Sequence, residues 1–210
     1  MLIRWRTLGA SLFTSKPATR AHPVVGASKV VRILNRVMIF MLFLALVPTL
    51  CITQTSPTYA YELWGYEWDD VDPLNYWIPF VLSSQYWYCW SDSVVNWDST
   101  ATDVDFVRTT PVNVYCSITV ESGAEWDGLT SITVQGSEIT DADCYLNTYY
   151  TGSYTTNQRR SVASHEIGHS LGLDDTSGAV VMNGYTDDRY GEYGVYTAQQ
   201  DDIDGVNAMY

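Results

Sequence analysis

The sequence His-Glu-Ile-Gly-His at positions 165–169 constrains the fold of this chain more than any other feature. Two histidines four residues apart lie on one face of an α-helix, so both imidazoles can approach a single ion. Apolar residues between Ser161 and Leu171 recur near helical spacing, and Gly172 tolerates the left-handed backbone of a helix end. The sequence therefore predicts a helix over about 161–171 that presents a metal site.

Glu166 lies one position along from His165, beside the expected metal rather than on it. Zinc lowers the pKa of a bound water to about 7 and polarises the scissile carbonyl of a peptide. A carboxylate within hydrogen-bond reach can take the proton of that water as general base and later donate it to the leaving amine. We therefore expect His165 and His169 as zinc ligands and Glu166 as the catalytic base. A surface helix that carries the three residues without a metal is the alternative.

A third ligand must come from outside this helix, because catalytic zinc has three protein ligands and one open position. The remaining histidine, His22, lies near the N-terminus, so a three-histidine site is not expected. A turn after Gly172 would bring Asp175 back to the metal, and a carboxylate oxygen is a normal zinc ligand. Asp174 is the alternative third ligand.

The run from His165 to Asp175 resembles the extended zinc-binding motif of the metzincins, in particular the matrixin-type metalloproteases. That motif ends in a third histidine, whereas this chain has Asp175 there, as in small secreted bacterial proteases of the snapalysin type. The resemblance places Met182 in the methionine turn beneath the zinc. The segment 201–210 is similar to the final helix of matrixin catalytic domains, which implies structural roles for Asp201 and Asp202.

Strand-like segments precede helical ones in the sequence. Strands are expected over 76–84, 112–120, 130–134 and 141–147, a short helix within 91–105 and a final helix over 197–210 that begins with a Thr197–Gln200 capping box. This order predicts an α+β domain. The resemblance implies a zincin-like (metzincin) single domain with a twisted, mostly parallel sheet, whose edge would take an extended substrate as an added strand.

The first 60 residues differ in composition from the remainder. Seven of the 11 basic residues precede position 37, an apolar run covers 37–47, and all 24 acidic residues follow position 61. Basic, then apolar, then small residues is the order of a secretory signal peptide. We expect residues 1–60 to be a leader cleaved after Ala60, and residues 61–210 to be the secreted catalytic domain. An uncleaved anchor is the alternative, although the run is shorter than the roughly 20 residues that span a bilayer.

The acidic composition bears on the partners of this domain. It contains four arginines and no lysine, so its surface would repel nucleic acid and anionic membranes, and neither is an expected partner. We expect a monomer that binds protein or peptide substrates. Some carboxylates could bind structural calcium, and a solvated acidic surface is the alternative; the candidates are Asp69, Asp70, Asp72 and Asp127.

Three cysteines and several aromatic residues leave alternatives open. Cys116 and Cys144 are the preferred disulfide pair, with Cys89 left over, and buried free thiols are the alternative. Tyr185 is expected either as a wall of the substrate pocket or as a surface loop residue. The aromatic residues at 86–90 favour core packing over a sugar-stacking platform.

Together these features predict a secreted zinc-dependent endopeptidase. The first alternative is a catalytically inactive secreted binding protein on a metzincin scaffold, although an inactive scaffold has no chemical need for Glu166. The second alternative is a surface-associated structural protein with an aromatic binding face.

Overall fold

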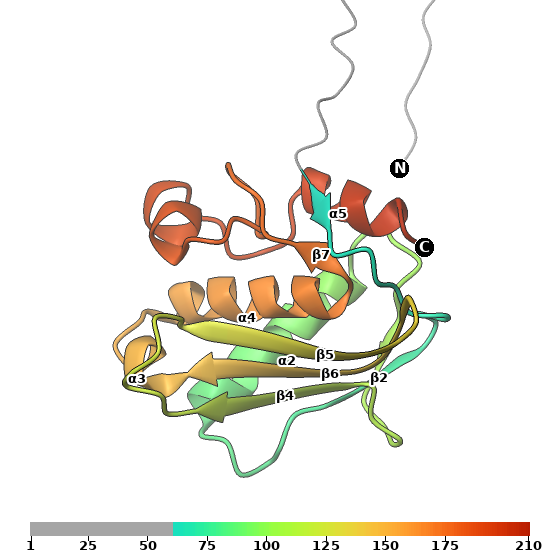
Figure 1. Ribbon diagram of the computed structural model, residues 1–210. Helices are drawn as coiled ribbons and strands as arrows, with labels where there is room; N and C mark the ends of the chain where they lie inside the picture. Colours follow the sequence, from blue (N-terminus) through green and yellow to red (C-terminus); the bar gives the residue numbers. More distant parts are fainter. Residues whose placement is uncertain (1–60) are drawn as a thin grey trace, which may run out of the picture. The chain divides into compact units, whose positions relative to one another are not determined.

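The computed structural model describes residues 61–210 (Figure 1). The expected leader, its signal peptide and cleavage after Ala60 lie outside the described residues. Within 61–210, no helix has the length and apolar character needed to cross a bilayer.

A five-stranded sheet forms one layer of the domain. Its order is β3-β2-β4-β6-β5, and its strands are β2 (Leu74–Trp77), β3 (Phe106–Val107), β4 (Val114–Thr119), β5 (Gly128–Gln135) and β6 (Glu138–Asn147). The first four strands in this order run parallel, and β5 pairs antiparallel with β6 at the edge. The mostly parallel α+β fold is therefore confirmed, and the three central strand predictions hold with small changes at their ends.

Two predictions in the first half of the domain were wrong in extent. The strand expected over 76–84 ends at Trp77, and the helix expected within 91–105 is α2 (Ser84–Asp98). Tyr86, Trp90 and Trp97 are each at most 5 % exposed, because their spacing places them on one buried face of this helix. Of the aromatic residues at 86–90, Tyr86 and Trp90 thus pack in the core as expected, whereas Trp87 is half-buried and Tyr88 is 59 % exposed.

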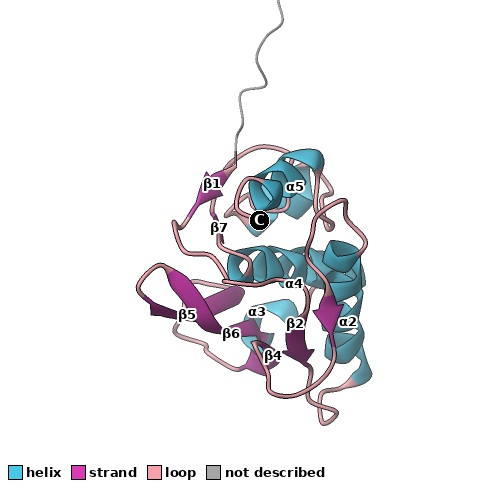
Figure 2. Cartoon of the chain, turned by 90° about the vertical axis from the view of Figure 1, so that its right-hand side faces the viewer, coloured by secondary structure: helices cyan, strands magenta, loops and turns pink. Residues whose placement is uncertain are grey.

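The central helix α4 (Thr156–Ser170) carries the His-Glu-Ile-Gly-His segment. It begins five residues before the predicted start, because Thr155 caps it by accepting a hydrogen bond from the backbone N–H of Gln158. It ends as predicted, since Gly172 has a φ of +96°. Nearly every residue from Arg159 to Ser170 is buried, because the sheet and α2 cover one side of α4 and the C-terminal segments cover the other (Figures 1 and 2).

The C-terminal segments lie on the side of α4 opposite the sheet (Figure 2). They comprise β7 (Leu173–Asp174), the π-helix η1 (Asp187–Glu192) and α5 (Gln200–Asn207). Strand β7 pairs with β1 (Glu62–Leu63) at the start of the domain. The short helix α3 (Thr148–Thr151) follows β6 and precedes α4. These segments return the chain to α4 after Gly172 and complete the site described below.

Helix α5 is fixed by Asp202 rather than by the predicted Thr197–Gln200 capping box. The capping box joins Gln199 and Asp202. The buried Asp202 carboxylate also accepts hydrogen bonds from the backbone N–H groups of Val181 (2.9 Å) and Met182 (3.0 Å). The predicted box was wrong because α5 begins at Gln200 with Gln199 as its N-cap, so Thr197 lies too early in the chain to cap the helix. Asp202 has the structural role that the resemblance implied.

The three cysteines of the domain are free, so the expected Cys116–Cys144 disulfide is not formed. Cys116 and Cys144 are fully buried register partners on the parallel strands β4 and β6. Side chains of such partners run side by side from the sheet, whereas a disulfide needs Cβ–S directions that converge. The alternative of buried free thiols therefore holds.

We expect Asp202→Ala to lower the free energy of unfolding by at least about 3 kcal/mol, because three backbone N–H groups lose their acceptor in the interior. Asp204→Ala is the matched control, since Asp204 accepts only an exposed bond from the Gln200 side chain; its effect should stay within about 0.5 kcal/mol. Denaturant titration of both variants measures the difference. Equal losses would contradict the role assigned to Asp202.

Candidate active site and metal centre

Three side chains that could ligate a metal converge beside the middle of α4. His165 Nε2 lies 3.2 Å and His169 Nε2 lies 3.4 Å from Asp175 Oδ1. Of the residues that the structure describes, they form the group whose ligand atoms lie close enough to share an ion, all within 4.8 Å of one another. The structure thus brings together the two histidines and the carboxylate predicted as a ligand set.

Both imidazole rings are oriented by backbone carbonyls. His165 Nδ1 lies 2.9 Å from the carbonyl oxygen of Val181, and His169 Nδ1 lies 2.9 Å from that of Leu173. Each Nδ1 therefore carries the proton and donates it to the carbonyl, which leaves the Nε2 lone pair directed at the group's centre. Burial also lowers the pKa of His165 to about 3, which keeps this ring neutral as a ligand must be.

The arrangement fits a zinc ion. Ligand atoms about 2.0–2.1 Å from a tetrahedral zinc stand about 3.4 Å apart, close to the 3.2 and 3.4 Å between Asp175 Oδ1 and the two histidine Nε2 atoms. Two imidazole lone pairs and a carboxylate oxygen that face one another repel, and a cation between them removes this repulsion. Asp175 is also more exposed than the histidines, so the group opens to solvent on one side.

Asp174, the alternative third ligand, does not join the group. Adjacent residues in an extended segment point to opposite sides, so Asp174 and Asp175 cannot both face the histidines. The Asp174 carboxylate instead accepts a hydrogen bond from Trp64 Nε1 at 2.8 Å. The Trp64 ring in turn stacks on His169, with ring centroids 4.8 Å apart. Asp174 and Trp64 therefore form one side of the site.

The Glu166 carboxylate lies against strand β5. Its Oε2 accepts a hydrogen bond from Thr130 Oγ1 at 2.7 Å, and only 3 % of Glu166 is exposed. A Cβ on Gly128 would lie 2.2 Å from Glu166 Oε1, so this position must be glycine for the carboxylate to approach the strand. Burial raises the pKa of Glu166 to about 7. A carboxyl poised between its two protonation states near neutral pH is suited to general acid–base work.

Sequence reasoning missed Gly128 and Thr130 as parts of the site. They lie two residues apart, so they share one face of β5, and this face meets α4. The alternation alone could have indicated a shared face. It could not have indicated that Glu166 is the neighbour, because that contact joins residues 36 positions apart.

Met182 packs beneath α4 as the resemblance implied. A Cβ on Gly168 would lie 2.2 Å from Met182 Sδ, so the glycine within the His-Glu-Ile-Gly-His segment allows this close approach. Gly184 has a similar role, since a Cβ there would lie 3.0 Å from the Asp175 carboxylate. The turn around Met182 therefore supports the metal group from below and from the side.

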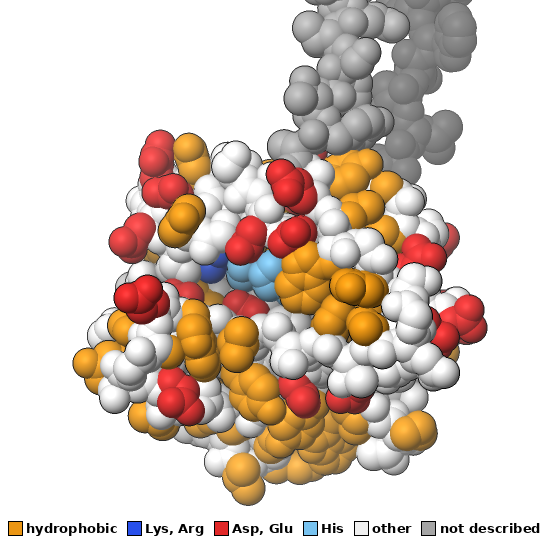
Figure 3. Space-filling model, viewed as in Figure 1, with side chains coloured by type: hydrophobic (Ala, Val, Ile, Leu, Met, Phe, Trp, Pro, Cys, Tyr) orange, Lys and Arg blue, Asp and Glu red, His pale blue; other side chains and the backbone are white. Residues whose placement is uncertain are grey.

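A cleft of about 480 Å³ opens over the metal group. Figure 3 shows its position on this face, with acidic side chains above and below the histidine atoms, basic atoms on their left and hydrophobic side chains on their right. Tyr185 is 75 % exposed and lines the cleft, in agreement with its expected place in the pocket wall. The other lining residues include Trp64, Glu125, Trp126, Asp127, Leu129, Tyr150, Tyr154, Asp174, Thr186, Asp187 and Arg189.

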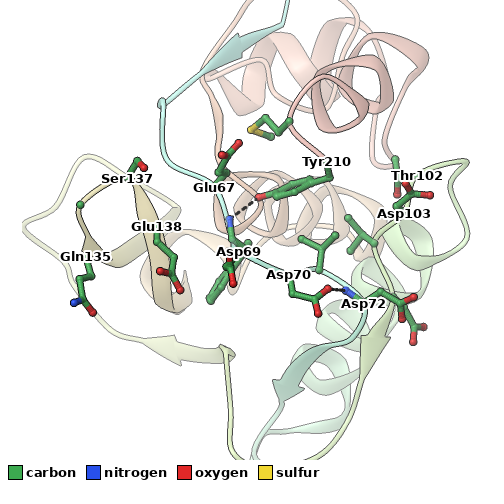
Figure 4. Close-up of a pocket in the computed structure, with 16 residues that line it drawn as sticks. Glu67, Asp69, Asp70, Asp72, Thr102, Asp103, Gln135, Ser137, Glu138 and Tyr210 are labelled. Atoms are coloured by element: carbon green, nitrogen blue, oxygen red, sulfur yellow. Dashed lines mark hydrogen bonds between the residues drawn. The ribbon is translucent and has the colours of Figure 1, made fainter.

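A second, larger cavity lies away from the metal group and is strongly acidic (Figure 4). Asp69, Asp70 and Asp72 line it, whereas Asp127 lies in the cleft over the metal group. Asp70 accepts a hydrogen bond from the backbone N–H of Asp72, and the labelled carboxylates point in different directions (Figure 4). These aspartates form no metal-ligating group within residues 61–210, so the expectation of calcium is not supported.

Comparison with known proteins agrees with this geometry. A family model described as matrixin (Peptidase_M10) matches residues 92–210, from within α2 to the end of the chain. The match includes the metal group, Glu166, the methionine turn and α5. A search of curated proteins found no match. Since the matched region covers more than half of the sequence, the chain belongs to the matrixin family of metalloproteases.

Proposed function

We propose that this chain is a secreted zinc-dependent endopeptidase that uses Glu166 as its general base. One observation carries the proposal: two imidazoles and the Asp175 carboxylate converge at 3.2–3.4 Å beside the buried Glu166. Membership of the matrixin family supports peptide-bond hydrolysis as the reaction. His165, His169 and Asp175 are the proposed zinc ligands.

Zinc held by these three residues would supply a Lewis acid that polarises the scissile carbonyl and acidifies water. Glu166 would accept the proton of the attacking water where its carboxylate lines the cleft and donate it to the departing amine. Thr130 holds one carboxylate oxygen of Glu166, and the Gly128 backbone limits the movement of the other. The chain thus contributes a positioned base, and no covalent intermediate with the enzyme is needed.

The substrate would bind as an extended strand along β5. This strand pairs with β6 on one side only and ends the sheet order, so its other edge can accept a peptide. Gly128 and Leu129 of β5 line the cleft beside Glu166. A peptide in this position would carry its scissile carbonyl past the metal group.

Secretion is part of the proposal and rests on the sequence. The order of basic residues, an apolar run and small residues before position 61 is typical of a cleaved signal peptide. The domain that would remain, residues 61–210, is the part that the structure describes as one folded unit.

Chelator-sensitive cleavage tests the function itself. We expect purified protein to cleave casein or an unstructured peptide, and we expect a zinc chelator to stop cleavage. Glu166→Ala should retain one zinc per protein and lose turnover by a factor of about 10²–10⁴, because zinc ligation does not involve this carboxylate. Full activity in Glu166→Ala would exclude the mechanism. Zinc at one equivalent in wild type, without turnover on broad peptide libraries, would favour an inactive binding protein.

Asp175→Ala should weaken zinc binding at least about 100-fold, because the site loses one of three protein ligands. Asp174→Ala is the matched control: it removes the same charge at the adjacent position, and its carboxylate bonds to Trp64 instead. The measurement is the metal-to-protein ratio after dialysis, together with peptidase activity. Loss of zinc from Asp174→Ala and not from Asp175→Ala would reverse the ligand assignment.

Thr130→Val should lower kcat by a factor of about 10–100, since Glu166 loses a hydrogen bond that holds its carboxylate. KM and zinc content should change little, because the Thr130 hydroxyl bonds to Glu166 and Thr130 is not among the proposed zinc ligands. Thr130→Ser keeps the hydroxyl and should restore kcat. A serine variant as slow as the valine variant would show that the methyl group, and not the hydrogen bond, matters.

A further inference from the structure

We infer that the cleft over the metal group selects peptides with lysine or arginine side chains next to the scissile bond. The inference rests on the proposed function and assigns its substrate class. It is carried by the charges that line this cleft, by the position of its single basic side chain and by the charge of the whole domain.

Four carboxylates line the cleft in addition to the base and the third ligand. They lie on both sides of the metal group and are half-buried or exposed: Glu125, Asp127, Asp174 and Asp187. Asp174 lies at the Trp64 side, where it accepts the indole hydrogen bond. Asp127 accepts a hydrogen bond from Tyr154 at 3.0 Å, and the charges of both Asp127 and Asp187 act on this tyrosine. A bound peptide would therefore meet carboxylates on either side of its scissile bond.

None of these four carboxylates forms an ion pair among the described residues, although the charge of Arg189 acts on Asp127. The arginine ion pair found there joins Arg160 to Asp92, and the other ion pairs are those of Asp175 with the two histidines. The electric field of a carboxylate that has no ion pair extends into the cleft, because the surrounding protein has a low dielectric constant and focuses the field into the opening. A cationic side chain is the complementary ligand.

Arg189 is the basic residue of the cleft lining; its charge acts on Asp127 and offsets only part of this field. Only 1 % of Arg189 is exposed. Its Nε donates to Ser161 Oγ at 2.9 Å, Nη2 donates to Thr186 Oγ1 at 2.7 Å, and Nη1 donates to the carbonyl of Asn183. All three nitrogens thus anchor η1 to α4 and to the methionine turn. Six lining carboxylates, the Arg189 guanidinium and a bound divalent ion together give the cleft a formal charge of −3.

The domain as a whole reinforces this preference. Residues 61–210 contain four arginines, no lysine and all 24 acidic residues, a formal charge of −20. Such a field attracts cationic peptides and raises their rate of association, and it slows the approach of acidic ones. The local field of the cleft then acts on the side chains that flank the scissile bond.

Three peptide series that differ only at the residues flanking the cleaved bond test this inference. One series carries lysine there, one glutamine and one glutamate. We expect kcat/KM to fall in that order, with lysine over glutamate by roughly tenfold or more at low salt and by less at 1 M salt. The double variant Asp127→Asn, Asp187→Asn keeps the acceptor for Tyr154 and should bring the ratio toward one. Asp103→Asn removes an exposed charge in the second cavity and should leave the ratio unchanged.

The outcomes separate the inference from the function on which it rests. Chelator-sensitive cleavage of the glutamine series, with equal kcat/KM for lysine and glutamate, would overturn the inference and leave the proposed function standing. A preference for glutamate would also overturn it and would assign specificity to Arg189. An equal loss of the lysine preference in Asp103→Asn would show that the charge of the whole domain, and not the cleft, is responsible. Absence of cleavage in every series would overturn both.

Discussion

The site depends on two hydrogen bonds that join α4 to the segments following it. The Nδ1–H groups of His165 and His169 donate to the carbonyls of Val181 and Leu173, one on the methionine turn and one on β7. These bonds turn both Nε2 atoms toward the same point and hold the returning chain at the distance where Asp175 can reach it. The same contacts thus orient the ligands and fold the C-terminal segments onto the helix. A metal would add to an arrangement that the protein already specifies.

Support for this arrangement comes from groups that touch no metal. Asp202 holds the methionine turn from the side opposite His165, and its position on α5 explains why the end of the chain belongs to the site. Gly168 lets Met182 approach α4, and Gly128 lets Glu166 approach β5. Each glycine marks a place where two elements come closer than a methyl group would allow. Function here therefore depends on close packing around α4 as well as on the ligands.

The carboxylates of the domain divide by solvent exposure into those that stabilise the fold and those that line the cleft. Carboxylates that serve the fold, such as Asp202, are buried and satisfied by backbone N–H groups. Those around the cleft are half-buried or exposed, and the single guanidinium in the cleft lining, that of Arg189, offsets only part of their charge. The carboxylates of the cleft and the total charge of the domain thus both favour cationic side chains.

Local pattern was sufficient for the existence of α4, its end at Gly172, the three central strands and the placement of His165 and His169 on one helix face, because these depend on residue spacing and on glycine backbone freedom. It failed at the strand over 76–84, at the cap of α5 and at the Cys116–Cys144 pair, because each depends on what the segment packs against. Asp174 and Asp175 were both candidates by composition; the pairing of β7 with β1 decided between them by directing adjacent side chains to opposite sides. The sequence by itself determined which residues could ligate a metal and act as base. Only the tertiary structure decided that Thr130 and Gly128 hold that base and that Arg189 is enclosed, since those contacts join segments far apart in the chain.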